Sequence, residues 1–328
     1  MTTASKPTLN EICAPVQQEL QAFNRRLQKE LSSQDDLIRG IHEHLLKMTG
    51  KFLRPLLAIL CSRVENKKPE QVIPLSVAIE LIHTATLVHD DIIDDSSFRR
   101  NQPSVHSKWG REISIVSGDY LYAKAFLLLA GFQDARISQA FAACAHVMCE
   151  GEMKQIEKRN QFLMKEEEYL KIIHQKTAAL FQAACMGGAY FSGTGLENVE
   201  KLGRYGYGLG MAFQIVDDCL DIVGETETLG KTAGLDVYKN EVTLPLLYLF
   251  SDLPGAESQV LLTRIQRGDQ SALDKIRQLA VEKKSVWRAM QKAREYAERS
   301  QEELSGLQES PFKDSLRQLT DYCLERIK

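Results

Sequence analysis

Two clusters of aspartates are the residues of this 328-residue chain best suited to chemistry. The first, residues 89–95, reads HDDIIDD, and the second, residues 217–221, reads DDCLD. In a helix, Asp90 and Asp94 would lie on one face, because residues four apart are neighbours. Carboxylate oxygens with few nitrogen or sulfur ligands nearby suit Mg²⁺. The clusters therefore predict a divalent-cation site, with Mg²⁺ expected and Mn²⁺ as the alternative.

Each cluster follows a long apolar helical pattern, so both are expected near helix C-termini. The helix dipole is negative there and adjacent carboxylates repel, so stability alone would favour Lys or Arg at these places. The arrangement makes sense if cations bind. A pair of solvated acidic helix ends is the alternative that the pattern leaves open.

Basic residues that could bind an anion lie at three places. Lys51 and Arg54 are three apart and share a helical face. Arg99 and Arg100 follow the first acidic cluster, and Lys176 lies in a helix of otherwise apolar and small residues. Lys and Arg suit diphosphate oxygens. Each alone is more often a solvated surface charge, but together with two metal clusters they indicate an anion site.

Helical periodicity dominates the elements that must position these residues. Apolar residues recur at helical spacing over residues 72–88, 139–156, 166–186 and 199–220. Residues 94–104 and 224–241 are polar and are expected as loops. Alternating strand patterns and a domain linker are absent. The prediction is an all-α fold with a single domain over residues 1–328.

Composition narrows the functional class. With 41 basic and 44 acidic residues the net charge is −3, and no basic stripe indicates nucleic-acid binding. No uninterrupted apolar stretch reaches the about 20 residues that a membrane span needs. The seven cysteines are odd in number and contain no C-x-x-C pair, so free thiols in the cytoplasm are expected rather than disulfides or a zinc site.

The motifs resemble those of the trans-type (head-to-tail) isoprenyl diphosphate synthases over roughly residues 50–245. The first aspartate-rich motif continues into Arg99-Arg100, and the second is preceded by FQIV. This resemblance implies one large helical bundle of the isoprenoid synthase type with a central active-site cavity. It also implies a homodimer and a magnesium-dependent prenyltransferase. Peripheral membrane contact could serve product release.

The resemblance implies a role for each matching residue. The metal ligands would be Asp90, Asp91, Asp94, Asp217, Asp218 and Asp221. Isopentenyl diphosphate would be held by Lys51, Arg54, His83 and Arg100. The allylic diphosphate would be held by Arg99, Lys176, Thr177, Gln214 and Lys231. The residues closest to the chemistry would be Asp90, Asp94, Lys176 and Asp217.

Small residues before the first motif bear on product length. Ala85 and Thr86 lie one turn, about 5.4 Å, below the aspartates. Relatives with short products commonly carry a bulky aromatic near here, so a tunnel open at this depth predicts a hexaprenyl to decaprenyl product. Leu81, Ile82 and residues 117–129 are candidates for its floor. A short-chain, farnesyl or geranylgeranyl, product is the alternative, since small residues could instead serve close packing.

One position departs from the pattern of this family, and one alternative from another class of protein remains. Asn240-Glu241 stands before VTLP, where the family usually has Gly-Lys, which puts a second-lysine contact in question. Glu80-Leu81-Ile82-His83 is a Glu-x-x-His pair of the kind that di-iron bundles use. Such sites need two copies, and the sequence offers one. His42 and His44 are expected at the surface.

Overall fold

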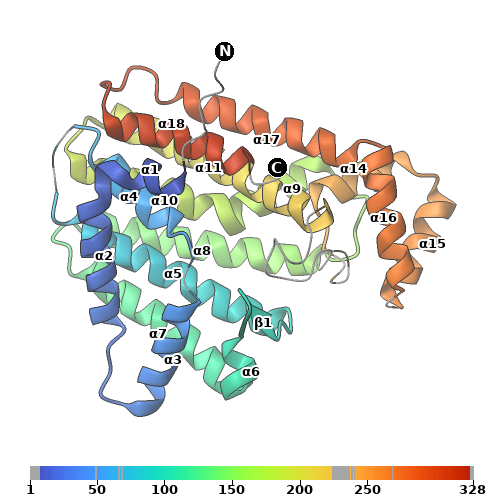
Figure 1. Cartoon of the computed structure of the whole chain (residues 1–328), viewed down its shortest axis with the longest axis horizontal. Helices are drawn as coiled ribbons and strands as arrows, with labels where there is room; N and C mark the ends of the chain where they lie inside the picture. Colours follow the sequence, from blue (N-terminus) through green and yellow to red (C-terminus); the bar gives the residue numbers. More distant parts are fainter. Residues whose placement is uncertain are drawn as a thin grey trace. The chain divides into compact units, whose positions relative to one another are not determined.

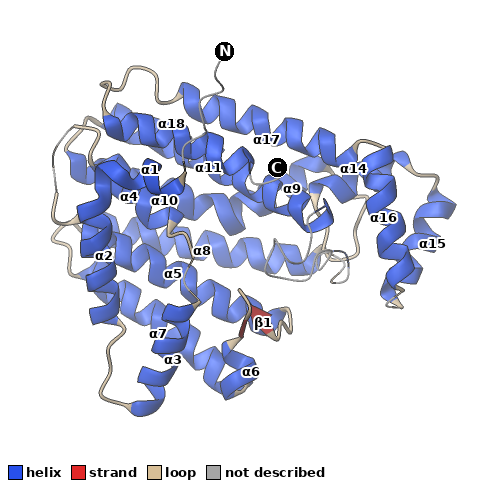
Figure 2. Cartoon of the chain, in the orientation of Figure 1, coloured by secondary structure: helices blue, strands red, loops and turns tan. Residues whose placement is uncertain are grey.

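The computed structural model describes residues 8–48, 50–65, 67, 69–223, 237, 239, 241–267 and 269–325, and these are almost entirely helical (Figures 1 and 2). The all-α prediction is confirmed. The helices are α1 (Leu9–Cys13), α2 (Gln17–Glu30), α3 (Asp36–Lys47), α4 (Leu53–Ser62), α5 (Val72–Ile93), α6 (Val105–Trp109), α7 (Arg111–Ala130), α8 (Ala135–Glu157), α9 (Glu166–Ile173), α10 (Ala179–Ser192), α11 (Leu196–Val223), α14 (Leu244–Asp252), α15 (Gly255–Gln266), α16 (Gln270–Glu282), α17 (Ser285–Glu302) and α18 (Pro311–Leu324). The remaining described elements are short. They are a 3₁₀ turn, η1 (Ala14–Val16), a π-helical turn, η2 (His174–Ala178), and two strands, β1 (Phe98–Arg99) and β2 (Gln102–Pro103).

Two compact units make up the chain. The first unit comprises residues 1–145, 180–206 and 303–322, and the second comprises residues 146–179, 207–302 and 323–328. The boundaries between them fall within α8, α10, α11 and α18 and at the end of α17. The single domain expected over residues 1–328 stays a prediction.

Helix α5 is the core of the first unit. Its sequence is apolar on nearly every side, which is typical of a helix buried all round. It packs against α2, α4 and α7, which lie around it in Figure 1. The helix ends at the first acidic cluster, where Asp94 is the C-cap and its N–H donates to the Asp90 carbonyl oxygen at 2.8 Å. The expected helix end at this cluster is confirmed.

Two helices are long and apolar enough to cross a membrane by length and composition alone, α5 and α7. The apolar part of α5 is mostly buried inside its unit, which accounts for its composition. In α7 only 28% of the corresponding window is buried. The sequence analysis did not single these helices out, because polar and charged residues interrupt both apolar runs.

The loop predicted over residues 94–104 contains a small β-ribbon. Strands β1 and β2 pair antiparallel, with Arg99 opposite Gln102. The two residues between them, Arg100 and Asn101, both have positive φ (50° and 61°). This is the backbone of a tight two-residue hairpin, whose twist matches that of the paired strands. The hairpin places Arg99 on a strand and Arg100 at the turn.

The expectation that His42 and His44 lie at the surface is wrong. Only 3% of His42 and 5% of His44 is exposed. Each ring is buried with a backbone partner: His42 Nδ1 lies 2.8 Å from the Leu31 carbonyl oxygen, and His44 Nε2 lies 2.7 Å from that of Pro103. A buried imidazole is tolerated when a carbonyl satisfies it. His44 thereby ties α3 to the β-ribbon.

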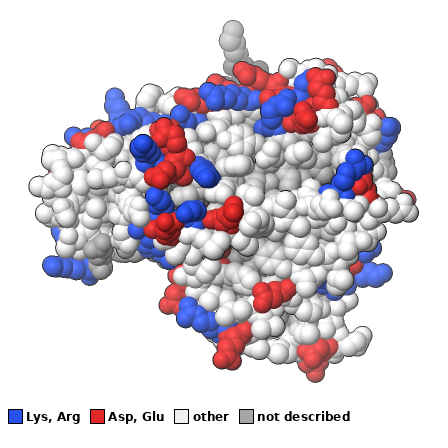
Figure 3. Space-filling view, turned by 180° about the vertical axis from the view of Figure 1, so that it is seen from behind, with Lys and Arg blue, Asp and Glu red and all other residues white. Residues whose placement is uncertain are grey.

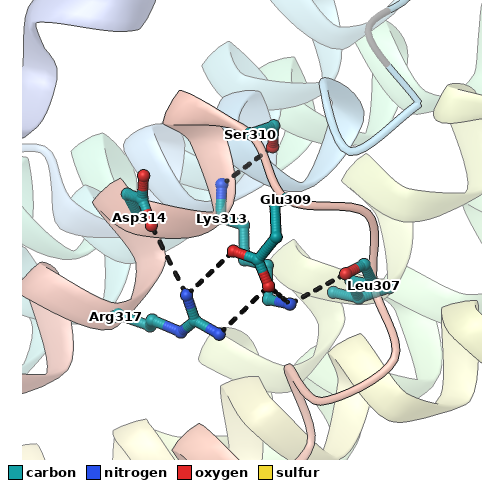
Figure 4. Close-up of polar contacts among 6 residues, drawn as sticks. All are labelled: Leu307, Glu309, Ser310, Lys313, Asp314 and Arg317. Carbon is teal, nitrogen blue, oxygen red and sulfur yellow. Dashed lines mark hydrogen bonds and ion pairs between the residues drawn. The ribbon is translucent and has the colours of Figure 1, made fainter.

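A buried lysine fixes the start of α18. Only 3% of Lys313 is exposed, and its Nζ donates to the Leu307 carbonyl oxygen (2.8 Å) and to Glu309 Oε1 (2.6 Å). Arg317 donates to the other oxygen of Glu309 at 3.1 Å, and Figure 4 shows this network. Because the buried ammonium is paired, the loop before α18 is held to that helix. Tyr322 lies in the last turn of the same helix.

Two apolar clusters form the core of the second unit. One joins α14, α15 and α16, for example through Leu246, Leu261 and Ile276. The other packs α9 and α14 against the later part of α11 and against α17, with Ile215 and Ala293 fully buried. The second cluster holds the end of α11, where the second acidic motif lies.

On the face that Figure 3 shows, charged side chains of both signs gather in patches between broad areas without Lys, Arg, Asp or Glu. Many Lys and Arg side chains there lie next to Asp or Glu side chains. The ion pairs among the described residues agree with this view: Lys158 lies 3.1 Å from Glu168, and Lys292 lies 3.1 Å from Glu166.

Candidate active site

The first acidic motif closes the last turn of α5. Asp90 and Asp94 are half-buried, whereas Asp91 is only 2% exposed. Arg99 Nε donates to both oxygens of Asp91, at 2.9 and 3.0 Å, and Arg99 Nη2 lies 2.8 Å from Oδ1. Asp91 therefore holds Arg99 in a fork-like ion pair. Its role as a metal ligand stays a prediction, as do those of Asp90 and Asp94.

A histidine orients the arginine predicted to bind isopentenyl diphosphate. Arg54 Nη1 lies 3.1 Å from His83 Nε2, and the Arg54 guanidinium stacks 4.5 Å from the centre of the Phe181 ring. Arginine has no acceptor, so His83 Nε2 must accept and its proton must sit on Nδ1. Burial, followed by the charges of Arg54, Arg100 and Arg99, holds the His83 pKa well below its usual value. His83 is thus a neutral acceptor that positions Arg54.

A buried carboxylate, Glu80, lies among the same cations. Burial raises the pKa of Glu80 to about 7, while the charges of Arg54 and Arg100 act in the opposite direction. Three neighbouring guanidinium groups would repel a metal cation from His83. The Glu80-x-x-His83 pair therefore serves arginines in this fold, which argues against the di-iron alternative.

Arg100 and Lys51 have defined partners. Arg100 Nη1 donates to the Met48 carbonyl oxygen at 2.6 Å. A Cβ at Gly50 would lie 2.4 Å from Arg100 Nη2, so a larger residue there would displace this guanidinium. Lys51 Nζ donates to the Tyr322 hydroxyl at 2.6 Å. The first unit thus gathers cations that were predicted to bind one diphosphate, and it adds Tyr322.

The predicted chain-length residues differ in exposure. Ala85 is fully buried, as are the candidate floor residues Leu81 and Ile82. Thr86 is half-buried, and its hydroxyl donates to the His83 carbonyl oxygen at 2.7 Å. Of the two positions, only Thr86 has an exposed part in this structure.

The second unit holds a pocket of about 630 Å³ that opens to solvent. It brings together five residues predicted to bind substrate or metal, namely Lys176, Thr177, Gln214, Asp217 and Asp218. Asp221, also predicted as a metal ligand, is fully buried and does not line the pocket. Further polar lining residues, which sequence reasoning did not assign to the site, are Gln155, Lys158, Tyr169 and Thr243.

A chain of hydrogen bonds fixes the pocket's polar wall. The Thr177 hydroxyl donates to Gln214 Oε1 at 2.7 Å, which orients that amide. Gln214 Nε2 then donates to Asp218 Oδ1 at 2.8 Å, and the Tyr169 hydroxyl donates to Asp218 Oδ2 at 2.5 Å. Burial raises the pKa of Asp218 to about 7, against these two hydrogen bonds and helped by the neighbouring charges of Asp217 and Glu241.

Lys176 and Thr177 lie on a π-helical turn. The sequence predicted one helix over residues 166–186, but η2 interrupts it between α9 and α10. Such single π turns occur frequently at functional sites. A Cβ at Gly151 would lie 2.5 Å from the Lys176 backbone nitrogen, so glycine lets α8 reach this turn. Lys176 Nζ lies 2.5 Å from Glu152 Oε2 on α8.

Glu241 is the position of the departure from the family pattern, and it lines the pocket. Only 8% of it is exposed. Gln155 Nε2 donates to Oε2 at 2.6 Å, and Arg159 Nη2 donates to Oε1 at 3.3 Å. A cation therefore accompanies the unexpected carboxylate. The predicted residue Lys231 and most of the loop predicted over residues 224–241 lie outside the described residues.

The donor chemistry fits a hard divalent cation. Within the described ranges, no three His, Cys, Asp or Glu side chains converge on one point as a ready-made metal cage. Mg²⁺ does not need such a cage, because it uses one or two carboxylates and completes its shell with water and phosphate. Asp90 and Asp94 in the first unit and Asp217 in the second supply carboxylates of this kind.

Comparison with known proteins gives the family. A family model described as polyprenyl synthetase matches residues 35–282. The chain belongs to the polyprenyl synthetase family. Its members named below are prenyltransferases of isoprenoid biosynthesis, and the chain is an enzyme of this class. The recognition made from the two aspartate-rich motifs is confirmed.

Individual relatives match over nearly their whole length. The all-trans-nonaprenyl-diphosphate synthase (geranyl-diphosphate specific) of Rhodobacter capsulatus is 33% identical over 97% of this chain and 98% of its own. The octaprenyl diphosphate synthase of Haemophilus influenzae is 33% identical over 97% of each.

Among solved structures, a polyprenyl synthase from Caulobacter crescentus CB15, complexed with calcium and isoprenyl diphosphate, is 31% identical with a TM-score of 0.93, and covers 99% of this chain and 100% of its own.

We expect Tyr169→Phe to destabilise the metal-free protein more at about pH 9 than at about pH 5. With a pKa of about 7, Asp218 is charged at the higher pH, where the Tyr169 hydroxyl donates to a carboxylate. Loss of a hydrogen bond costs about 2 kcal/mol when the acceptor is charged and about 1 kcal/mol when it is neutral. Urea unfolding with chelator at both pH values measures the difference.

The sign of this pH dependence follows from the raised pKa of Asp218. Because the folded-state pKa lies above the usual value of an aspartate, this group favours the folded state at low pH, and that contribution is lost as the pH rises through about 7. Removing a donor to the charged form raises the pKa further and enlarges the loss. In an Asp218→Asn background, Tyr169→Phe should cost the same at both pH values. Equal costs with Asp218 present would contradict the argument.

Proposed function

We propose that this enzyme is a divalent-metal-dependent trans-polyprenyl diphosphate synthase. It condenses isopentenyl diphosphate successively onto an allylic diphosphate. The observation that carries the proposal is the pocket of the second unit, where Lys176, Gln214 and Asp217 line one cavity. A cation, an amide and a metal-binding carboxylate are what an allylic diphosphate with its metal requires.

The chain's own residues bind and orient both substrates. Lys176 and the Gln214 amide bind the allylic diphosphate, and the motif assigns Arg99, which Asp91 holds, to the same substrate. Lys51, Arg54 and Arg100 bind isopentenyl diphosphate. Holding the two substrates in reacting geometry supplies the orientation part of catalysis.

The bond between carbon and diphosphate of the allylic substrate breaks first. Bound Mg²⁺, or Mn²⁺ in its place, would supply Lewis-acid stabilisation of the departing diphosphate, and we assign its ligands to Asp90, Asp94 and Asp217. The double bond of isopentenyl diphosphate then attacks the allylic cation, and loss of a proton completes the new double bond. Lys176 stays near the leaving group and stabilises its charge.

We propose a product in the hexaprenyl to decaprenyl range. The relatives with nonaprenyl and octaprenyl products support this range. So does the absence of a bulky side chain at Ala85 and Thr86, one turn before Asp90. A geranylgeranyl or farnesyl product is the competing outcome.

We propose that the enzyme is a homodimer in the cytoplasm. Helix α7 carries exposed apolar side chains, with Val116 64% and Leu127 74% exposed. Together with Tyr120 they lie on one side of the helix, because positions 116, 120 and 127 follow its repeat. Exposed apolar patches of this kind mark interfaces. The seven cysteines are all free, which suits a reducing compartment.

The purified enzyme should form long prenyl diphosphates from isopentenyl diphosphate, farnesyl diphosphate and Mg²⁺. Mass spectrometry of the products measures this. Asp90→Ala and Asp217→Ala should each lower turnover by orders of magnitude, because each removes a metal carboxylate. Asp321→Ala, an aspartate outside both motifs, is the control. Full activity in excess chelator, or in either motif variant, would refute the assignment.

Thr86→Phe should shorten the product. The position is half-buried and one turn before the aspartates, so a ring there obstructs the growing chain. Thr84→Phe, also half-buried on α5 but rotated to another side of the helix, is the matched control. Ala85→Phe is a stronger block, but at a fully buried site it must first be shown to fold by circular dichroism. An unchanged product distribution in Thr86→Phe contradicts this view of the tunnel.

Val116→Asp combined with Leu127→Asp should convert a dimer to a monomer. A carboxylate at a buried interface loses its hydration without a partner. Sedimentation velocity measures the mass. Leu163→Asp, which changes a side chain 79% exposed in the second unit, should leave it unaltered. A dimer that persists in the double variant would place the interface elsewhere.

A further inference from the structure

The pocket of the second unit poses a problem of charge. Its acidic lining residues are Asp217, Asp218 and Glu241, and its basic ones are Lys158 and Lys176. Both lysines already face carboxylates, Lys158 with Glu168 at 3.1 Å and Lys176 with Glu152 at 2.5 Å. With three acidic and two basic lining residues, the pocket by itself would not favour an incoming diphosphate. Another cation is needed, and Glu241 adds a negative charge instead.

Arg159 lies just beyond the end of α8 and adjoins the pocket through its partner Glu241, which lines it, although Arg159 is not itself a lining residue. Its Nη2 donates to Glu241 Oε1 at 3.3 Å, and its side chain is 24% exposed. The charge is therefore only partly hydrated, which strengthens its attraction for an anion. A guanidinium offers donors in a planar fork, a geometry that can bridge a carboxylate and a phosphate.

Both carboxylate oxygens of Glu241 accept hydrogen bonds, so Glu241 can hold the Arg159 side chain in place. Gln155 Nε2 donates to its Oε2 at 2.6 Å, while Arg159 binds its Oε1. Gln155 also lines the pocket, one turn from Glu152 on the same helix. Glu152 and Gln155 are three apart on α8 and share one face of that helix, and they contact Lys176 and Glu241 respectively. Arg159 contacts Glu241 from the turn that follows the helix.

We propose that Arg159 binds the allylic diphosphate and that Glu241, with Gln155, is the positioning residue that holds it there. This inference rests on the proposed function, since it names the ligand of that pocket. The cation that position 241 does not carry is supplied by Arg159. The pair is neutral by itself, so Glu241 does not oppose the substrate.

The test uses the full-length protein and inorganic pyrophosphate with Mg²⁺, measured by calorimetry, together with the two KM values. Arg159→Leu should weaken pyrophosphate binding and raise the allylic KM by about tenfold or more, with the isopentenyl KM unchanged. Arg159→Lys, which keeps the charge but loses the planar fork, should cause a smaller loss than Arg159→Leu without matching the wild type. Arg159→Leu combined with Glu241→Lys should recover much of the loss, because a cation returns to the pocket.

Arg288→Leu is the matched control. Arg288 pairs with Asp252 at 2.7 Å in the same unit, and neither residue of this pair lines the pocket, whereas the partner of Arg159, Glu241, does. The loss of Arg288 should therefore leave pyrophosphate affinity unchanged. If Arg159→Leu does not fold, Arg159→Gln takes its place. Pyrophosphate affinity within about twofold of wild type in the Arg159 variant overturns the proposal. An equal rise in both KM values also overturns it.

The two proposals fail in different ways. If the wild-type protein forms no prenyl product yet binds pyrophosphate through Arg159, only the proposed function is wrong. If it forms product and the Arg159 variant matches it in binding and in KM, only the role of Arg159 is wrong.

Discussion

The buried carboxylate of Asp218 is the charge on which the second unit's site depends. A carboxylate removed from water is costly unless donors compensate it. Tyr169 and Gln214 provide two donors, and Thr177 fixes the orientation of the Gln214 amide. Satisfying one buried group therefore ties together α9, the π turn and the end of α11. The same contacts aim Lys176 and Asp217 into the pocket.

In the first unit the charges that must be compensated are positive, because several arginine side chains lie close together. Arg54, Arg99 and Arg100 would repel one another in a poorly hydrated site. Asp91 binds Arg99, and the buried Glu80 lies near the other two arginines. His83 remains neutral beside them and accepts from Arg54. Carboxylates and one neutral imidazole thus make a cluster of guanidinium groups compatible with a folded core.

Sequence reasoning reached the parts of this arrangement that depend on local spacing. The end of α5 at Asp94 and the exposure of Asp90 and Asp94 follow from helical periodicity and the position of the apolar run. Tyr322 could not be found in this way, because its partner Lys51 is 271 positions away. Tyr169 was not predicted as a site residue for the same reason, because its partner Asp218 is 49 positions away.

The spacing of apolar residues also could not predict the π-helical turn in the backbone. The periodicity over residues 166–186 is continuous, and nothing in it signals the π turn that presents Lys176. The misplacement of His42 and His44 has a related cause, since a polar side chain is buried whenever a distant carbonyl satisfies it. In each case the contact that decides the local structure comes from a residue too distant in sequence for periodicity to indicate.

The ion pairs of the site also explain why a metal should govern substrate affinity. Lys176 faces Glu152, Arg99 faces Asp91, and Arg159 faces Glu241. A diphosphate must compete with these carboxylates, so its binding free energy is the difference between new and existing pairs. That difference is small while the carboxylates stay in place. In the proposed function, divalent cations on the aspartates would favour the diphosphate, because they would neutralise the acidic side of the site and bind phosphate oxygens themselves. The carboxylates keep the Lys and Arg side chains ordered before substrate arrives, and tight binding would then depend on metal.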